Sequence, residues 1–357
     1  MSGFYSLKIA NIRRETADSV SICFDVPADM AGNFKFRPGQ HLTIKQDING
    51  EEVRRNYSVC VAPHENELRI AIKQVTGGVF STWANTALQA GALVDVMSPH
   101  GSFTWKFDDA KKRRYACFAG GSGITPILSI IKSGLKEEPN SEFVLFYGNR
   151  ASATVMFLEE LAGLKNRYLT RLQVYHFLED EFEDVELFNG RLDRAKADEV
   201  LKTLIDPKEI DGFFICGPGP MMTAVEDALH ANNVPKDRIL IERFTTGALS
   251  AAQVEAAKVL QQEAAGRKVQ ITLDGRRRVF TFDAEKGSIL ENARAAGAPA
   301  PFACKAGVCA TCRAKVVSGE VKMKQNYGLS EEELAQGYVL TCQAVPMTDD
   351  VKLDYDA

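Results

Sequence analysis

The chain has 357 residues, of which 45% are hydrophobic and 25% are charged, as in ordinary globular proteins. This length predicts two or three domains, and no apolar run approaches the ~20 residues of a membrane span. A formal net charge of -4 is too mild to indicate a nucleic-acid or anionic-membrane partner. The first ten residues lack the pattern of a signal peptide, so we expect a cytoplasmic protein without disulfides.

Residues 1–108 have the pattern of an antiparallel β-barrel. Short stretches with alternating apolar residues, such as 5–9, 20–24 and 68–72, lie between turn signals such as Asn49-Gly50. Many short strands joined by tight turns are typical of barrels. We therefore expect a barrel domain over this region.

Residues 109–246 alternate apolar strands with helical stretches, which predicts a doubly wound parallel sheet. Glycine-rich turns follow two of these strands, at Gly120 to Pro126 and at Cys216 to Met222. Open backbone at a strand end can approach a pyrophosphate. The first turn lacks the last glycine of G-x-G-x-x-G, so a purely structural turn is the alternative. The predicted strands cover 115–119, 143–147, 172–178, 213–216 and 239–241.

Residues 247–266 are rich in Ala, Gln and Glu and poor in large apolar groups, which predicts an interdomain linker, helical in part. A hairpin pattern around Asp274-Gly275 then opens a small domain over 267–357. Ser330 to Glu333 forms a capping-box sequence, so we expect a short helix there. A strand at 338–342 follows it and ends on Cys342.

Four cysteines of this last domain have the ligand spacing of a plant-type 2Fe-2S cluster. Cys304, Cys309 and Cys312 are spaced C-x4-C-x2-C, and Cys342 follows from a distant element. Zinc is the alternative, but paired zinc ligands would more naturally show two C-x2-C knuckles. The sequence therefore favours an iron-sulfur site. Three other cysteines, Cys23, Cys60 and Cys117, are interpreted as small core residues.

The motif order resembles a known family. Arg55-Asn56-Tyr57-Ser58 and the two glycine-rich turns resemble the ferredoxin-NADP reductase family over roughly residues 1–246, and the part from about 267 resembles a plant-type ferredoxin. The resemblance implies a flavin barrel, an α/β nucleotide domain and an α+β (β-grasp) ferredoxin domain. Among reductase components of multicomponent oxygenases, those of phenylacetyl-CoA epoxidases are most similar, in the stretches at 36–41, 146–150, 240–244 and 307–312.

This resemblance also implies residue roles. Arg55 would hold the FAD phosphate, Tyr57 would stack on the isoalloxazine ring and Ser58 would lie near N5, although Tyr57 could instead be a core aromatic. Cys216 and Glu242 would lie beside the nicotinamide and flavin, although a plain strand end is the alternative for Glu242. The other implied cofactor contacts are Gly77, Gly78, Val79, Ser81, Gly121, Gly123, Thr125, Gly217, Met222 and Phe244.

Coenzyme choice depends on charge beside the adenosine ribose. Arg150 and Arg191 lie where some NADPH-using relatives place phosphate-binding arginines, which favours NADPH. The strand ending at Leu178 runs into Glu179-Asp180 instead of a Ser-Arg pair, so NADH remains open. FMN in place of FAD also remains open.

The sequence thus predicts an NADPH-dependent reductase that passes electrons from FAD to a 2Fe-2S cluster. Flavin is needed because a nicotinamide gives two electrons together, whereas the cluster accepts one. The resemblance implies a di-iron oxygenase acting on phenylacetyl-CoA as the acceptor. Charge and hydropathy, as noted above, give no expectation of a nucleic-acid or membrane partner. One alternative is the reductase of another oxygenase, such as a steroid or ring hydroxylase. The non-enzyme alternative is an electron carrier or redox sensor.

Overall fold

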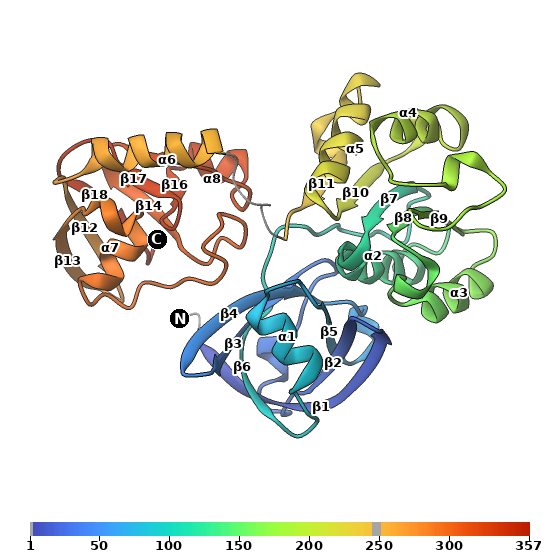
Figure 1. The fold of residues 1–357 in the computed structure, drawn as a ribbon, viewed down its shortest axis with the longest axis horizontal. Coiled ribbons are helices and arrows are strands. Elements are labelled where there is room, and N and C mark those ends of the chain that lie inside the picture. The colour runs from blue at the N-terminus through green and yellow to red at the C-terminus, as the bar shows by residue number, and fades with distance from the viewer. Residues whose placement is uncertain (1–2, 245–250) are drawn as a thin grey trace. The chain divides into compact units, whose positions relative to one another are not determined.

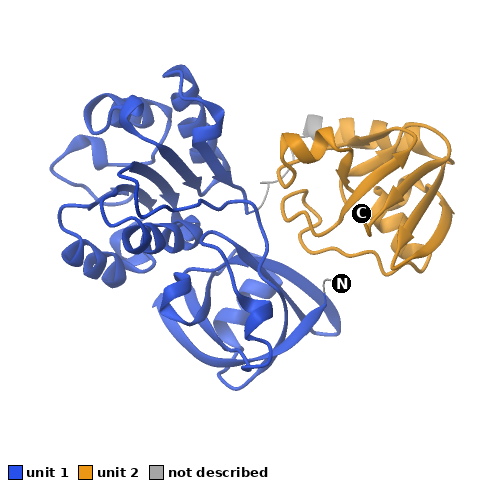
Figure 2. Cartoon of the chain, turned by 180° about the vertical axis from the view of Figure 1, so that it is seen from behind, with its two compact units in different colours: residues 1–244 blue, residues 245–357 orange. Residues whose placement is uncertain are grey.

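The structure is a computed structural model that describes residues 3–244 and 251–357, with side chains from residue 254 in the second range. Two compact units make up the chain, Met1–Phe244 and Thr245–Ala357 (Figure 2). No helix within the described ranges is long and apolar enough to cross a membrane.

The first half of unit 1 is the predicted barrel. Its antiparallel sheet has the order β4-β3-β6-β1-β2-β5, and a bridge between Val59 and Ile70 joins the two ends of that order. Asn49 and Gly50 both have positive φ, as a two-residue hairpin turn requires. The elements are β1 (Phe4–Thr16), β2 (Ser19–Asp25), β3 (His41–Ile48), β4 (Glu51–Ser58), β5 (Leu68–Lys73), α1 (Val79–Thr86) and β6 (Leu93–Met97) (Figure 1).

The second half of unit 1 is the predicted doubly wound domain. Five parallel strands have the order β11-β10-β7-β8-β9. Separate apolar clusters cover the two faces of the sheet, one with α2 and α3 and the other with α4 and α5. The elements are β7 (Arg114–Gly120), α2 (Ile124–Glu137), β8 (Glu142–Asn149), α3 (Leu158–Arg167), β9 (Leu172–Leu178), α4 (Arg194–Thr203), β10 (Gly212–Cys216), α5 (Gly219–Ala231) and β11 (Ile239–Glu242).

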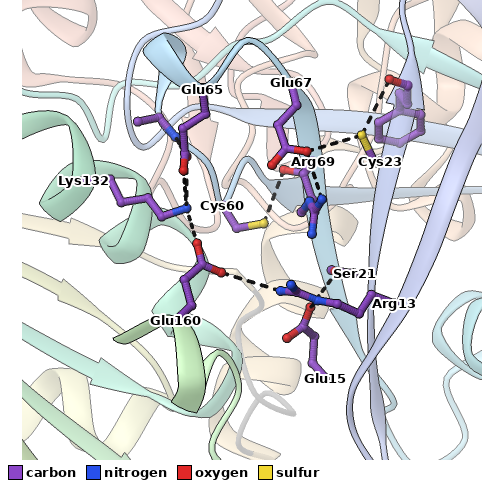
Figure 3. Close-up of polar contacts among 12 residues, drawn as sticks. Arg13, Glu15, Ser21, Cys23, Cys60, Glu65, Glu67, Arg69, Lys132 and Glu160 are labelled. Carbon is purple, nitrogen blue, oxygen red and sulfur yellow. Dashed lines mark hydrogen bonds and ion pairs between the residues drawn. The ribbon is translucent and has the colours of Figure 1, made fainter. Parts of the chain in front are cut away.

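A polar cluster joins these two halves (Figure 3). Lys132 of α2 is only 5% exposed and lies between two carboxylates, Glu65 of the barrel at 2.9 Å and Glu160 of α3. Arg13 of β1 also reaches Glu160, at 3.6 Å. Ser129 of α2 donates a hydrogen bond to the carbonyl of Val61. Because a buried ammonium needs close partners, this cluster fixes the barrel against α2 and α3.

Unit 2 is the predicted α+β domain. Its main sheet has the order β13-β12-β18-β14-β16, and β15 pairs with β17 in a second, small sheet. Ser330 and Glu333 form the predicted capping box at the start of α8. The elements are α6 (Ala251–Ala264), β12 (Lys268–Leu273), β13 (Arg276–Thr281), α7 (Ile289–Ala295), β14 (Arg313–Ser318), β15 (Val321–Met323), α8 (Glu331–Ala335), β16 (Tyr338–Leu340), β17 (Ala344–Pro346) and β18 (Val351–Asp354).

The segment predicted as a linker, 247–266, contributes a helix to unit 2. Residues 247–250 lie outside the described residues, and α6 follows them. Leu260 and Ala264, one helical turn apart, join the apolar core of unit 2, and Gln261 donates to the carbonyl of Gly287 at 3.0 Å. We therefore propose that the ferredoxin-like domain begins with α6 instead of at residue 267.

Candidate functional site

The predicted flavin residues line the end of β4. Ser58 is 1% exposed, and its Oγ has no hydrogen-bond partner among the residues that the structure describes. Tyr57 is half-buried, with its ring 5.5 Å from that of Phe80 in α1. Arg55 is exposed and donates to the carbonyl of Arg54. A buried hydroxyl without a partner is costly, so Ser58 fits a site that a ligand atom completes.

The predicted cofactor contacts Gly77, Gly78, Val79 and Ser81 lie at the start of α1. Gly77 has φ +72°, and a Cβ added there would meet no atom within 4 Å, so the backbone is open on that side. Gly78 is the N-cap of α1, and Val79 is its first residue. Ser81 Oγ accepts from the Val75 amide at 3.0 Å and donates to the Gly78 carbonyl. This loop fits a phosphate at a helix N-terminus.

The two glycine-rich turns of the nucleotide half meet, as the sequence predicts. A Cβ on Gly123 would lie 2.0 Å from the carbonyl oxygen of Cys216, and one on Gly217 would lie 2.9 Å from the Gly120 amide nitrogen. Gly121 has φ +51° and open space at its Cβ position. Only glycine, which lacks a Cβ, permits the backbones of the two turns to approach this closely. Thr125 Oγ1 donates to the Ser122 carbonyl, whereas the Met222 side chain is buried in the core.

Cys216 and Glu242 are paired across β10 and β11. The pKa of the Cys216 thiol is raised, first by burial and then by the Glu242 carboxylate. His41 of β3 lies opposite Ser58 in the barrel sheet, and its Nδ1 is 3.6 Å from Glu242 Oε1. Phe244 packs on the same apolar core as Cys216. The structure therefore brings Ser58, Cys216 and Glu242 to one seam between the two halves of unit 1.

His41 is a site residue that the sequence analysis did not single out. It is 4% exposed, and its ring lies 4.3 Å from that of His100. Burial lowers the pKa of His41 well below its usual range, and His100 adds to the effect, which favours the neutral imidazole. No sequence motif marks it, because β3 mixes polar and apolar residues.

Arg150 and Arg191 lie together where β8 and β9 end. The Asp180 amide donates to the Arg150 carbonyl at 2.8 Å, which joins the segments after the two strands. Arg191 is 80% exposed, and its Nε donates to Glu179 at 2.9 Å. Glu179, one of the two acidic residues that left NADH open, is thus paired with Arg191. Arg150 is exposed as well.

The four predicted cluster ligands form two thiol pairs. Cys304 interacts with Cys309, and Cys312 with Cys342. Backbone amides of Ala306 and Cys309 donate to Cys304 Sγ at 3.3 and 3.4 Å. A hydrogen bond from Cys304, followed by one with Thr311, lowers the pKa of Cys309 to about 5. Cys342 lies just after β16 instead of within a strand.

Two thiol pairs fit a binuclear cluster, which takes two thiolates at each iron. Among the described residues, no three His, Cys, Asp or Glu side chains surround a single metal position. The amides that face the sulfurs stabilise thiolate charge. The donor set and its surroundings therefore match the ligand chemistry of a 2Fe-2S cluster.

Three family models match the chain in order. They are an oxidoreductase FAD-binding domain over residues 6–105, an oxidoreductase NAD-binding domain over 118–227 and a 2Fe-2S iron-sulfur cluster binding domain over 271–347. The fold and the matched domains define an NAD(P)H oxidoreductase that carries flavin and iron-sulfur domains on one chain. The cluster domain resolves the choice between iron-sulfur and zinc in favour of iron-sulfur.

Two curated relatives match almost the full length. The E component of 1,2-phenylacetyl-CoA epoxidase from Escherichia coli is 43% identical over 357 residues, covering 100% of this chain and 99% of that one. The ferredoxin reductase component of 3-ketosteroid-9-alpha-monooxygenase from Rhodococcus rhodochrous is 33% identical over 354 residues, covering 98% and 96%. The chain belongs to this family of oxygenase reductase components, which includes the E component of 1,2-phenylacetyl-CoA epoxidase.

Solved structures share the fold. Phthalate dioxygenase reductase, at 24% identity, matches with a TM-score of 0.62 over 99% of this chain and 98% of its own. An intact type IV self-sufficient cytochrome P450 monooxygenase, at 21% identity, matches with a TM-score of 0.72 over 98% of this chain and 41% of its own. The predicted three-part architecture is therefore confirmed.

Proposed function

We propose that this reductase oxidises NADPH at FAD and delivers electrons singly, through its 2Fe-2S cluster, to the di-iron oxygenase of a phenylacetyl-CoA epoxidase. The observation that carries the proposal is the full-length identity of 43% to the E component of such an enzyme. The cytoplasm is the proposed location, since the described cysteines form no disulfide and four of them have the spacing of cluster ligands, as suits a reducing compartment.

The barrel residues would bind and orient the flavin. FAD, when bound, accepts two electrons from a nicotinamide and releases them one at a time. The planar guanidinium of Arg55 suits a phosphate, and the open backbone at Gly77 suits the other phosphate of the pair. Tyr57, half-buried against Phe80, would hold the ring, and Ser58 Oγ would hydrogen-bond at N5.

The nucleotide half would place the coenzyme against the same seam. The open backbone of Gly121, together with Gly123 and Gly217, suits a pyrophosphate. Thr125 and Cys216 would border the nicotinamide, and the buried, neutral thiol of Cys216 would exclude water from the transfer. Glu242, next to His41, is suited to exchange the proton that accompanies the two electrons.

The proposed coenzyme is NADPH. Arg150 is an exposed cation at the carboxyl ends of β8 and β9, where a 2'-phosphate would lie. Arg191 offsets the charge of Glu179 at the same place. These two arginines are the features that support NADPH over NADH, against the acidic run Glu179 to Glu181 that follows β9.

A second candidate is the reductase of another oxygenase. The 3-ketosteroid-9-alpha-monooxygenase relative, at 33% identity over the full chain, supports it. Both candidates use the same internal electron path and differ in the acceptor alone. An electron carrier or redox sensor without NADPH oxidation is less well supported, because both nucleotide-binding halves are intact.

Reconstitution distinguishes these candidates. The purified chain, loaded with flavin and cluster, would be mixed with NADPH and either a phenylacetyl-CoA epoxidase oxygenase or a ketosteroid monooxygenase oxygenase. We expect product from phenylacetyl-CoA and little from the steroid. The reverse result would favour the second candidate, and no NADPH oxidation even with ferricyanide would exclude both.

A further inference from the structure

A groove of about 920 Å³ lies beside the cluster cysteines of unit 2. Its walls come from α6, from the segment before α7, from the loop after Cys304 and from the segment after β15. Cys342, a predicted iron ligand, is part of the lining. The groove therefore opens directly at the place where electrons would leave the cluster.

Four lysines line this groove, and they come from four different segments. They are Lys258, Lys286, Lys305 and Lys324, whereas Glu291 is the single acidic residue of the lining. Lys305 pairs with Glu291 at 2.8 Å, and its side chain is still 47% exposed. Lys286 pairs with Asp283, which lies outside the lining. The four lysines still outnumber these two carboxylates, so the groove presents a positive field to a partner.

Side-chain hydrogen bonds hold the cluster loop against the groove. Gln343, next to Cys342, donates to the Lys305 carbonyl at 2.8 Å, and Gln325 donates to the Ala306 carbonyl at 3.2 Å. Lys324 Nζ donates to the Gly287 carbonyl at 2.8 Å, which fixes its position. The walls are thus preorganised around the thiol of Cys342. They would need little rearrangement to bind a partner.

We propose that this groove, defined by Lys258, Lys286, Lys305 and Lys324, docks an acidic surface segment of the protein that accepts electrons from the cluster. The inference rests on the proposed function, because it names the chemistry of the acceptor's docking side. Opposite charges speed encounter and fix orientation. Each encounter transfers one electron, so the cluster is oxidised by one electron and the acceptor is reduced by one.

The test reverses charge at two lysines that are not adjacent to any predicted ligand, in the double variant Lys258→Glu/Lys286→Glu. The matched control is Lys352→Glu on β18, an exposed position outside the groove lining. The loaded holoprotein of each would reduce the di-iron oxygenase at low and high salt. Direct binding would be measured in parallel, and so would flavin-to-cluster transfer without an acceptor.

We expect the double variant to bind and reduce the oxygenase about tenfold more slowly at low salt, with the difference shrinking at high salt. Cytochrome c, a basic acceptor, should be reduced faster than by wild type. Flavin-to-cluster transfer should be unchanged, and Lys352→Glu should resemble wild type.

Two results would overturn the docking proposal. One is an oxygenase reduction rate and salt dependence equal to those of wild type. The other is slowed flavin-to-cluster transfer with normal oxygenase binding, which would mean that unit 1 uses the groove. If wild-type protein cannot reduce the oxygenase at all, the proposed function fails instead, and the cytochrome c comparison alone then decides whether the groove selects acidic partners.

Discussion

The two units build their redox sites in opposite ways. In unit 2, three of the four predicted iron ligands come from one loop, 304–312, and the fourth follows β16. In unit 1, Cys216 and Glu242 are neighbours on paired strands, but Ser58 meets them only because the barrel packs against the nucleotide domain. Replacing one ligand is enough to destroy the local cluster site. The site between the two halves of unit 1 depends, in addition, on the contacts that pack the barrel against the nucleotide domain.

The largest expected effect is at the local site. Cys309→Ser replaces a thiolate with a poor ligand for iron, so the purified variant should lose iron and nearly all electron delivery to a protein acceptor. NADPH-driven ferricyanide reduction at the flavin should persist, because it needs only unit 1. Iron and sulfide analysis, with the ferricyanide assay as the control, checks both statements. Two irons and two sulfides in the variant would show that Cys309 is not a ligand.

A smaller loss is expected at the seam. Ser58→Ala removes the buried hydroxyl that lacks a hydrogen-bond partner among the described residues, and flavin reduction by NADPH should fall about a hundredfold, as when a preorganised donor is removed. The iron content should stay at the wild-type level. Ser58→Thr, which keeps a hydroxyl, is the matched control and should recover part of the rate. Equal rates for the alanine and wild-type proteins would mean that Ser58 has no part in hydride transfer.

The ion pairs that join the barrel to the nucleotide domain give a third comparison. Lys132→Ala leaves Glu65 and Glu160 without their shared cation, which should destabilise unit 1 by about 2 kcal/mol, after allowance for the partly exposed carboxylates. Loss of flavin fluorescence quenching should report earlier melting of unit 1, while bleaching of the cluster should report unchanged melting of unit 2. Lys112→Ala, at an exposed position in the same unit, serves as the control. A shift in both transitions would contradict separate stabilisation of the units.

The smallest effect concerns the coenzyme. Removing a charge-assisted contact to phosphate costs roughly 1.5 to 3 kcal/mol, so Arg150→Ala should weaken NADPH use about tenfold or more and hardly change NADH use. Arg191→Ala should have less effect, because Arg191 is already paired with Glu179. Steady-state kinetics with both coenzymes measures the ratio. Equal losses with NADPH and NADH would assign Arg150 to the fold or to the shared part of the ligand.

Local sequence patterns were sufficient to predict most of the fold. The strand predicted at 172–178 has those bounds in β9, and the Asn49-Gly50 and Asp274-Gly275 turns have positive φ as their hairpins require. Each depends on neighbours in the chain, so periodicity and turn chemistry were sufficient. The place of segment 247–266 in unit 2 could not be predicted in this way, because its helix has only a narrow apolar stripe around Leu260 and Ala264.

Contacts between distant segments could not be predicted from sequence patterns. The carboxylates around Lys132 come from the barrel and from α3, and His41 meets Glu242 only after both halves fold. The lysines of the groove likewise lie in four separate segments. The resemblance supplied the roles of Ser58, Cys216 and Glu242, but no spacing in the sequence fixes their distances.

The order in which the flavin and the cluster are reduced is the most direct test of the proposed electron path. Anaerobic rapid mixing of the loaded wild-type chain with NADPH, followed at flavin and cluster wavelengths, separates the two steps. We expect flavin absorbance to fall first and cluster absorbance second, and Cys309→Ser to retain only the first phase. Reduction of the cluster before the flavin, or at a normal rate in protein stripped of flavin, would contradict it.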